Sequence, residues 1–367
     1  CTNRLHSFIN KRIKFIMAYT TINKSTDYFN TKLYTGNDGT GRSITGVGFQ
    51  PDFVWVKDRS NAFSHGLFDV VRGATKTLNS NDTSADDTVS NSLTAFGSDG
   101  FTAGANAIIN GNNNNYASWN WKAGTSFSNS AGANGASIAS TGSANQDVGF
   151  SICTYTNTNT NTIKHGLDVV PDVLIAKTRG VSGSWFLGSE KMLGSWNKKL
   201  NLNNAGAVAT ETRPFYPGSA APTSSVFSSD QSVFGAGGSA TETMIAYCFA
   251  EKQGYSKFGS YIGNGNADGP MIYTGFKPAW IMIKRAIGGT DNWVMFDNKR
   301  SPFNEVNENL AANTDSSTNT GIKIDMLSNG FKCRVAEGNT NVAGNTYIYM
   351  AFGQTLVGTN NIPNNAR

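Results

Sequence analysis

Ten residues in the first third of the chain, Gly48-Phe49-Gln50-Pro51-Asp52-Phe53-Val54-Trp55-Val56-Lys57, decide the fold. Proline fixes φ and has no N–H to donate, which suits the first residue of a strand. Four apolar residues in a row then follow Asp52, a pattern typical of a strand that is covered on both faces. The segment therefore predicts a buried strand that begins near Pro51.

The same pattern occurs twice more, at residues 171–177 (PDVLIAK) and 278–284 (PAWIMIK). Each time a proline, one further residue and four apolar residues are followed by a lysine six positions after the proline. The flanks also recur in the same order, and each segment is closed by an aromatic strand, at 116–121, 244–249 and 347–352. Features that recur in a fixed order predict three divergent copies of one module.

Short-range patterns indicate β-structure throughout. Side chains alternate along the first closing strand, with Tyr116, Ser118 and Asn120 on one face and Ala117, Trp119 and Trp121 on the other. This period of two predicts a strand with one solvent-exposed face. Asp99-Gly100 and Asn329-Gly330 lie between apolar stretches and are hairpin signals. We expect an all-β chain of three tandem, divergent, jelly-roll-like β-sandwich repeats.

The repeats are expected at residues 17–124, 147–252 and 255–354. Residues 125–146 are rich in Gly, Ser, Ala and Asn and predict a flexible linker or a long surface loop. Residues 1–16 are basic and aperiodic, and we interpret them as a leader that is not native, with Met17 as the initiator. Residues 355–367 are expected to be a tail.

Composition narrows the function classes. Charged residues make up 15% of the chain, against about 25% in ordinary globular proteins, while aromatic residues make up 11%. A disordered chain could not bury so many aromatic rings. The net charge of +5 comes without a basic cluster interleaved with aromatics, so we expect no nucleic-acid binding. No apolar run approaches the roughly 18 residues of a membrane helix, so no membrane insertion is expected.

The cysteines, at positions 1, 153, 248 and 333, lack the C-x-x-C spacing of zinc and redox sites. Cys153 and Cys248 fall in the first and last strands of the second repeat, where they are either bonded or two buried thiols. Disulfides are therefore not expected to be what holds the fold together.

Catalytic motifs are absent from the sequence. It has no phosphate-binding loop, nucleophile elbow or His-Glu-x-x-His motif, and its histidines, His6, His65 and His165, are expected in loops. Residues 263–269 and the acidic loop with Asp82, Asp86 and Asp87 are interpreted as a turn and a solvated loop, in preference to phosphate or calcium sites. We expect no enzymatic activity, catalytic residue, cofactor or metal.

The pairs Asp69–Arg72 and Asp297–Arg300 recur at one place in the first and third repeats, which predicts a structural ion pair at a strand end. Six of the seven tryptophans lie in repeat strands and are expected in the core. The exception is Trp196, in a polar stretch, and it is our candidate for an exposed ligand contact. The predicted core includes Phe53, Trp55, Val173, Ile175, Trp280 and Met282.

Residues 48–57, followed by Phe-Asp-Val-Val-Arg-Gly at 68–73, Ser-Asp-Gly-Phe-Thr at 98–102 and Trp-Asn-Trp-Lys-Ala-Gly at 119–124, carry a resemblance. The chain resembles an uncharacterised domain of marine tailed-bacteriophage proteins of the virion structural or tail-fibre type. The resemblance is good over 33–124 and fair over 255–354. It is weak over 147–251, which lacks the Arg-Gly and Asp-Gly-Phe elements.

The resemblance implies a virion context and no specific chemistry. We therefore expect a non-enzymatic structural protein on the virion surface, an extracellular particle: a fibre, spike, or capsid or tail decoration. The alternative is an adhesin module that binds a carbohydrate or receptor such as a host surface glycan, and a polysaccharide-degrading tail enzyme is a third hypothesis. Three sandwiches in a row imply an elongated homo-oligomer, a trimer above all, or contacts with other virion proteins, made through the second and third repeats.

Overall fold

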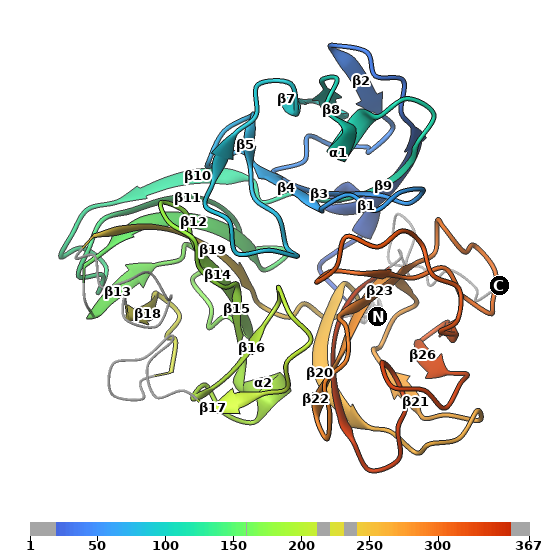
Figure 1. Cartoon of the computed structure of the whole chain (residues 1–367). Helices are drawn as coiled ribbons and strands as arrows, with labels where there is room; N and C mark the ends of the chain where they lie inside the picture. Colours follow the sequence, from blue (N-terminus) through green and yellow to red (C-terminus); the bar gives the residue numbers. More distant parts are fainter. Residues whose placement is uncertain (1–19, 159, 211–220, 231–240, 354–367) are drawn as a thin grey trace, which may run out of the picture.

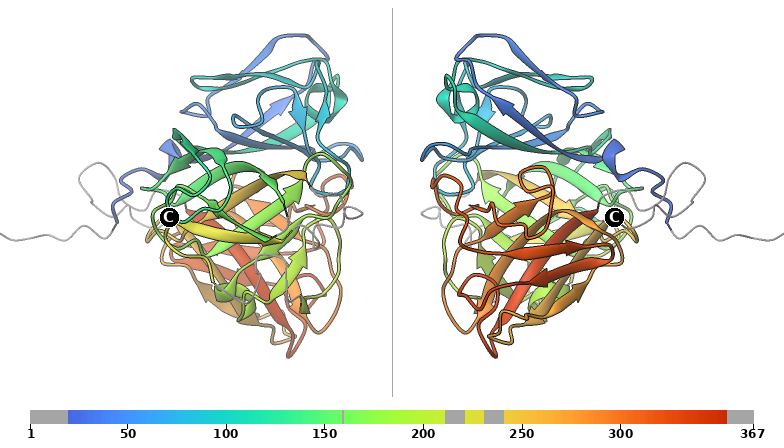
Figure 2. Two further views of the ribbon diagram at one scale, coloured as in Figure 1. Left: turned by 90° about the vertical axis from the view of Figure 1, so that its left-hand side faces the viewer. Right: turned by 90° about the vertical axis from the view of Figure 1, so that its right-hand side faces the viewer.

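The computed structural model describes residues 20–158, 160–210, 221–230 and 241–353, and the expectations for His6, the 1–16 leader, Met17 and the 355–367 tail lie outside these ranges. The fold is mostly β, with several antiparallel sheets. Figure 1 shows three lobes around a common centre, here called lobe 1 (20–124), lobe 2 (125–252) and lobe 3 (253–353). In both side views lobe 1 lies above the other two (Figure 2). The extended row expected from the sequence is therefore wrong.

Lobe 1 begins with a short 3-10 helix and contains nine strands and one helical turn. The elements are η1 (Ser25–Asp27), β1 (Phe29–Thr35), β2 (Arg42–Thr45), β3 (Phe53–Asp58), β4 (Gly66–Asp69), β5 (Lys76–Thr77), β6 (Asp87–Thr88), β7 (Leu93–Gly97), β8 (Gly100–Ala103), α1 (Ala107–Asn110) and β9 (Asn115–Trp121). Its main sheet has the order β1-β9-β3-β4, and a second sheet has the order β2-β8-β7. The expected hairpin at Asp99-Gly100 joins β7 to β8.

Lobe 2 has the largest sheet, with the order β10-β11-β12-β19-β14-β15-β16-β17, and a small sheet β13-β18. Its elements are β10 (Thr125–Asn129), β11 (Ser140–Asn145), β12 (Phe150–Asn157), β13 (Thr160–Lys164), β14 (Val173–Thr178), β15 (Phe186–Gly188), α2 (Glu190–Leu193), β16 (Lys198–Asn201), β17 (Ala209–Thr210), β18 (Val226–Asp230) and β19 (Glu242–Phe249). Like lobe 1 it thus has a main sheet and a smaller one, and its main sheet has additional strands at both edges.

Lobe 3 again has a main sheet, β20-β27-β22-β23-β24, and a small sheet, β21-β26-β25. Its elements are β20 (Ser256–Ile262), β21 (Met271–Tyr273), β22 (Pro278–Ile287), β23 (Val294–Asp297), β24 (Leu310–Ala311), β25 (Ile324–Leu327), β26 (Gly330–Cys333) and β27 (Thr346–Gly353). The expected hairpin at Asn329-Gly330 joins β25 to β26.

The three main sheets share one strand order around the proline-led strand. In each, this strand lies between the closing strand of the lobe and the next strand along the chain, as β9-β3-β4, β19-β14-β15 and β27-β22-β23. The registers also correspond, because Phe53 pairs with Trp121, Val173 with Phe249, and Trp280 with Phe352. The features that recur in the sequence thus occupy equivalent places in the sheets.

The apolar run of the proline-led strand is buried on both faces, as predicted. Phe53 and Trp55 belong to the large cluster at the centre of the molecule, whereas Val54 and Val56 belong to the separate core between the two sheets of lobe 1. The same division holds in β14 and β22. All six predicted core residues are buried. A run of four is needed because two residues face each core.

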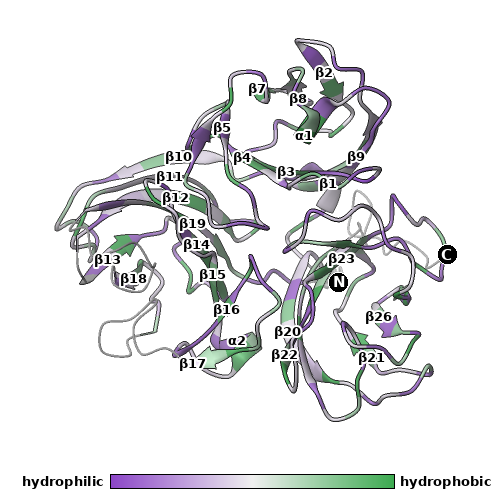
Figure 3. Cartoon of the chain, in the orientation of Figure 1, coloured by the Kyte–Doolittle hydropathy of each residue, from purple (hydrophilic) through white to green (hydrophobic). Residues whose placement is uncertain are grey.

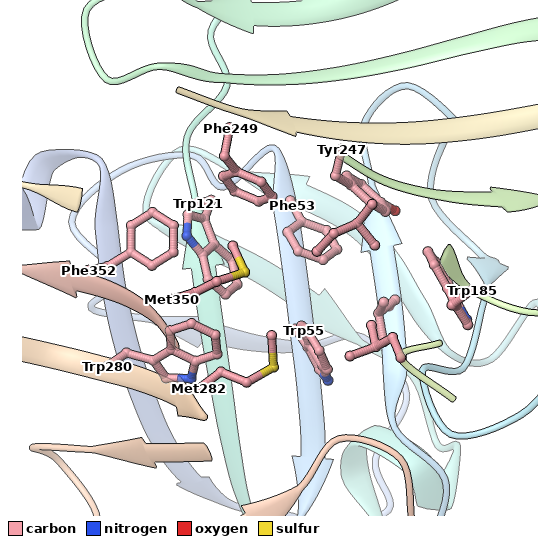
Figure 4. A pocket seen from close by; sticks show the side chains of 13 residues that line it. Phe53, Trp55, Trp121, Trp185, Tyr247, Phe249, Trp280, Met282, Met350 and Phe352 are labelled. Atoms are coloured by element: carbon pink, nitrogen blue, oxygen red, sulfur yellow. The ribbon is translucent and has the colours of Figure 1, made fainter. Parts of the chain in front are cut away.

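The central cluster is built from aromatic and apolar side chains of all three lobes, which point toward one another in Figure 4. The hydropathy colouring shows strands such as β3 and β23 as hydrophobic near this centre and many outer loops as hydrophilic (Figure 3). Packing leaves an apolar void of only about 20 Å³, too small for a ligand. The centre therefore holds the lobes together and is not a binding site.

The prediction of a linker at 125–146 is wrong. This segment forms β10 and β11, which add to the main sheet of lobe 2 next to β12. Strand pairing uses backbone groups, so it does not need the apolar periodicity that the segment lacks. Small residues even help, because a Cβ at Gly142 would meet the carbonyl oxygen of Ile152 at 2.2 Å and the Phe127 ring at 2.5 Å.

The exposed face expected for β9 is also not exposed. Ser118 and Asn120 are both buried, because the second sheet of lobe 1 covers that side. The Asn120 amide nitrogen donates to the backbone oxygens of Asn30 and Ser118 and to the Ser118 hydroxyl. A polar–apolar alternation here indicates a hydrogen-bonded interior.

Candidate functional site

The recurring lysines, the most reactive groups of the motif, are buried at the junctions between lobes. Lys57, Lys177 and Lys284 are all fully buried. Lys177 Nζ donates to Gly183 O of its own lobe at 2.6 Å and to Thr83 O of lobe 1 at 3.0 Å. Lys284 Nζ likewise donates to Arg285 O of its own lobe at 2.7 Å and to Ala205 O of lobe 2 at 3.0 Å. Lys57 differs, because both of its acceptors, Asp58 O at 2.6 Å and Asn61 O at 3.3 Å, belong to its own lobe.

Burial lowers the pKa of each of these lysines to about 8, from 10.5. A neutral amine still has two N–H groups to donate, so the bonds to the carbonyl oxygens survive loss of the proton. Each lysine thus holds two backbone carbonyl oxygens in place.

These lowered pKa values predict a stability that rises with pH. The lysines of the unfolded chain keep their protons to about pH 10.4, so between about pH 8 and 10 the unfolded state binds more protons than the folded state. We expect the free energy of unfolding to rise across this window, by about 1 kcal/mol for each lysine and pKa unit. Lys177→Met should flatten the rise in urea titrations, whereas Lys24→Met, at a side chain 61% exposed, should not. If the free energy of unfolding of Lys177→Met rose with pH as steeply as that of the unmodified chain, the lowered pKa of Lys177 would not be a cause of the rise.

A second set of contacts closes the three lobes into a ring. Trp185 Nε1 donates to Asn79 O of lobe 1 at 2.7 Å, and Trp293 Nε1 donates to Asn201 O of lobe 2 at 2.9 Å. The equivalent position in lobe 1 is occupied by His65, whose Nε2 lies 3.0 Å from Ala311 O of lobe 3. Each of the three junctions therefore has a hydrogen bond between a ring nitrogen of one lobe and a backbone carbonyl oxygen of the next.

The histidines lie in loops, as expected, but both are buried. His65 Nδ1 accepts a hydrogen bond from Trp55 Nε1 at 2.8 Å, which fixes the neutral tautomer, and burial lowers its pKa to about 3. Burial likewise lowers the pKa of His165 to about 4. Neither ring has a nucleophile beside it among its recorded partners, so neither arrangement resembles a catalytic triad.

The predicted ion pairs are present and fully buried. Arg72 Nε lies 2.6 Å from Asp69 Oδ2, and Arg300 Nε lies 2.5 Å from Asp297 Oδ2. Each carboxylate also accepts a bond from the next lobe in the ring, from Tyr247 Oη at 2.8 Å for Asp69 and from Trp119 Nε1 at 3.0 Å for Asp297. The pairs therefore belong to the lobe junctions.

Lobe 2 has a different arrangement at the corresponding place in its main sheet. Ser189 takes the place of the aspartate and accepts from the backbone N–H of Met192, which takes the place of the arginine. The position equivalent to Tyr247 and Trp119 in lobe 3 is Met350, which has no hydrogen to donate. The ion pair is thus missing in lobe 2, where the facing residue of lobe 3, Met350, could not donate a hydrogen bond to a carboxylate.

The other predicted loop and cysteine features have structural uses. Asp86, expected in a solvated loop, is nearly buried and bridges Arg72 and Arg179. Cys153 and Cys248 are unbonded buried thiols close enough to share a hydrogen bond. No group of His, Cys, Asp or Glu side chains within the described ranges could hold a metal ion, and no helix there is long and apolar enough to cross a membrane.

The exposed position expected for Trp196 is wrong. The ring is 7% exposed and packs in the core between the two sheets of lobe 2. Its sequence neighbours Ser195 and Asn197 are only half-buried, while the indole turns inward and joins the cluster that contains Leu174, Phe186 and Phe227. Little of the ring is left to stack on a ligand.

Two clefts lie on the surface instead. The first, of about 470 Å³, is lined by residues 124–127 and 144–147 and by Gly166, at the end of β10 and β11. The second, of about 350 Å³, lies on lobe 3 and is lined mostly by amide and hydroxyl side chains such as Asn292, Asn319 and Asn339. Of these two clefts, only the first is lined by an aromatic ring, that of Phe127. Smaller clefts are lined by Tyr155 and by Phe303. Sequence reasoning missed the first cleft because the segment was interpreted as a linker.

Comparison with known proteins gives one match. A family model described as "Domain of unknown function (DUF7483)" matches residues 24–355, which include all three lobes. No curated protein and no solved structure matches.

Proposed function

The chain belongs to this family, a domain of unknown function (DUF7483), and we propose that it is a non-enzymatic structural protein on the surface of a tailed-phage virion. The place in the particle is a fibre, a spike, or a capsid or tail decoration. The resemblance of residues 33–124 and 255–354 to marine phage virion proteins motivates the virion context.

One observation carries the non-enzymatic part of the proposal: the reactive groups of the recurring motif hold the lobes together. Lys177 and Lys284 clamp carbonyl oxygens across junctions, His65 is neutral and bonded on both ring nitrogens, and the buried ion pairs accept bonds from the next lobe. Because these lysine, histidine and ion-pair side chains join the lobes, they stabilise one fixed arrangement. Such an arrangement suits a structural protein that must keep its shape outside a cell.

We also infer that the lobes are divergent copies of one jelly-roll-like sandwich. The inference rests on the shared strand order and on side chains with identical tasks, such as Asn81, Asn203 and Asn313, which each accept the backbone N–H of His65, Trp185 or Trp293. An experimental structure in which these asparagines, the prolines and the lysines did not superpose would contradict it.

The virion assignment can be tested on particles from the natural source. Particles are purified on a density gradient and analysed by peptide mass spectrometry and by immunogold labelling with an antibody to this chain. We expect its peptides to sediment with the capsid protein and the label to lie on the outside of intact particles. Peptides confined to the soluble lysate would exclude the proposal.

Self-association through lobes 2 and 3 remains our proposal for assembly, with a trimer favoured. The large hydrophobic side chains that are exposed within the described ranges all lie on these two lobes: Val169, Val170, Ile262, Met271, Tyr273, Ile287 and Phe303. Met271 and Tyr273 share the exposed face of β21, and exposed apolar side chains that lie side by side mark interaction sites. We expect light scattering at micromolar concentration to give an oligomer mass that Tyr273→Ser with Phe303→Ser reduces. A monomer mass for the unmodified chain would contradict self-association in solution.

A further inference from the structure

The cleft at the end of β10 and β11 lies outside the framework that the three lobes share. Lobes 1 and 3 have no strands equivalent to β10 and β11, and the central cluster includes no residue of either strand. These strands extend the main sheet of lobe 2 beside lobe 1 (Figure 1). A segment that the common architecture does not need is a natural place for a function of its own.

The cleft is built around the ring of Phe127. The ring is half-buried and packs against the core of lobe 2. Two glycines make room for it, because a Cβ at Gly142 or Gly166 would lie 2.5 or 2.7 Å from Phe127 Cε1. The ring is thus held in place from below while it also lines the cleft.

Several of the polar groups around this ring are not used inside the molecule, although Gln146 Nε2 donates to Gly166 O at 3.4 Å and to Asp168 Oδ2 at 2.7 Å. The hydroxyls of Thr125 and Ser126, the side-chain nitrogen of Asn145 and the carboxylate of Asp147 make no hydrogen bond to the described residues, and Asp147 has no ion-pair partner among them. In the cleft of lobe 3, by contrast, Glu337 accepts hydrogen bonds from the side chains of Asn339 and Thr340. The cleft on lobe 2 therefore offers donors and acceptors beside an apolar ring.

We propose that this cleft binds a neutral saccharide. The C–H face of a sugar ring is apolar and packs on an aromatic ring, while its hydroxyls both donate and accept hydrogen bonds. A volume of about 470 Å³ is within the range of small-molecule sites. The one uncompensated charge of the lining, on Asp147, disfavours anionic sugars and phosphates. Nearby Asp168 is neutralised by Lys164 at 2.8 Å.

The test uses the full chain and saturation-transfer NMR with maltose, lactose, cellobiose and N,N′-diacetylchitobiose as neutral probes, and sialic acid and glucuronic acid as acidic ones. We expect transfer to the C–H protons of at least one neutral probe. Phe127→Leu keeps the apolar contact with the core but removes the ring, and should weaken binding about three- to tenfold. Asp147→Asn, at an exposed residue, should weaken it while the fold is retained.

Phe63→Leu is the matched control, because Phe63 is a half-buried ring in a loop of lobe 1 and does not line the cleft. It should leave transfer unchanged. The proposal is overturned if no neutral probe shows transfer at millimolar concentration, if both cleft variants bind as well as the unmodified chain, or if an acidic probe competes better than the neutral ones. Such a failure would leave the virion assignment untouched, because that is decided by the composition of the particles.

Discussion

Replacing Trp280 by alanine should destabilise the whole chain by about 3–5 kcal/mol, the range for deleting a large buried aromatic side chain. The ring is 1% exposed and belongs to lobe 3, but it packs edge to face on Trp121 of lobe 1, with centroids 5.7 Å apart. It also contacts Phe352 of its own lobe. The cavity would open at the junction of the lobes, so we expect one cooperative transition, with fluorescence and circular dichroism giving the same midpoint in urea.

Two further variants sharpen this prediction. Trp280 Nε1 has no hydrogen-bond partner, so Trp280→Phe removes an unsatisfied donor and much less volume, and should cost well under half as much as the alanine variant. Lys24→Ala, at a side chain 61% exposed, should stay within about 0.5 kcal/mol of the unmodified chain. A loss below about 1 kcal/mol for Trp280→Ala would mean that the centre is not what joins the lobes.

The sequence predicted those parts of the fold that a local pattern specifies. The proline and the four apolar residues of each copy correctly indicated strands buried on both faces, and the hairpins at Asp99-Gly100 and Asn329-Gly330 are present. Burial of Phe53 on one face and Val54 on the other follows from period two alone. The pattern could not predict that the other lobes cover the second face of each strand. An apolar run shows that both faces are buried, but it does not show which part of the chain buries them.

The errors have related causes. The 125–146 segment pairs through its backbone, which hydropathy does not record, and Ser118 and Asn120 are polar side chains of an interior. Trp196 was placed by its polar sequence neighbours, although the outcome depends on which way one side chain turns. The lysines were recognised only as markers of the repeat. A lysine that recurs directly after a doubly buried strand signals a buried cation, and that signal was available in the sequence.

The buried ion pairs supply the second large expected effect. Asp297 and Arg300 are both fully buried, and the Arg300 guanidinium, together with hydrogen bonds from the arginine, holds the pKa of Asp297 below its usual value against the opposing effect of burial. Asp297→Ser would leave the arginine without its carboxylate, and such broken buried pairs cost about 3–5 kcal/mol. The lowered pKa also means that this stabilisation is present above about pH 4 and is lost as the pH falls further.

Lobe 2 shows how the pair can be replaced, because it carries Ser189 and Met192 at the equivalent positions. The double variant Asp297→Ser with Arg300→Met copies that arrangement into lobe 3. The double variant removes the uncompensated Arg300 charge, so it should recover most of the free energy of unfolding that Asp297→Ser loses in urea unfolding experiments. A deficit of about 1–3 kcal/mol should remain, since Trp119 Nε1 loses its acceptor. If the double variant were no more stable than Asp297→Ser alone, the uncompensated arginine would not be the cause, and the carboxylate would matter chiefly as the acceptor that ties lobe 1 to lobe 3.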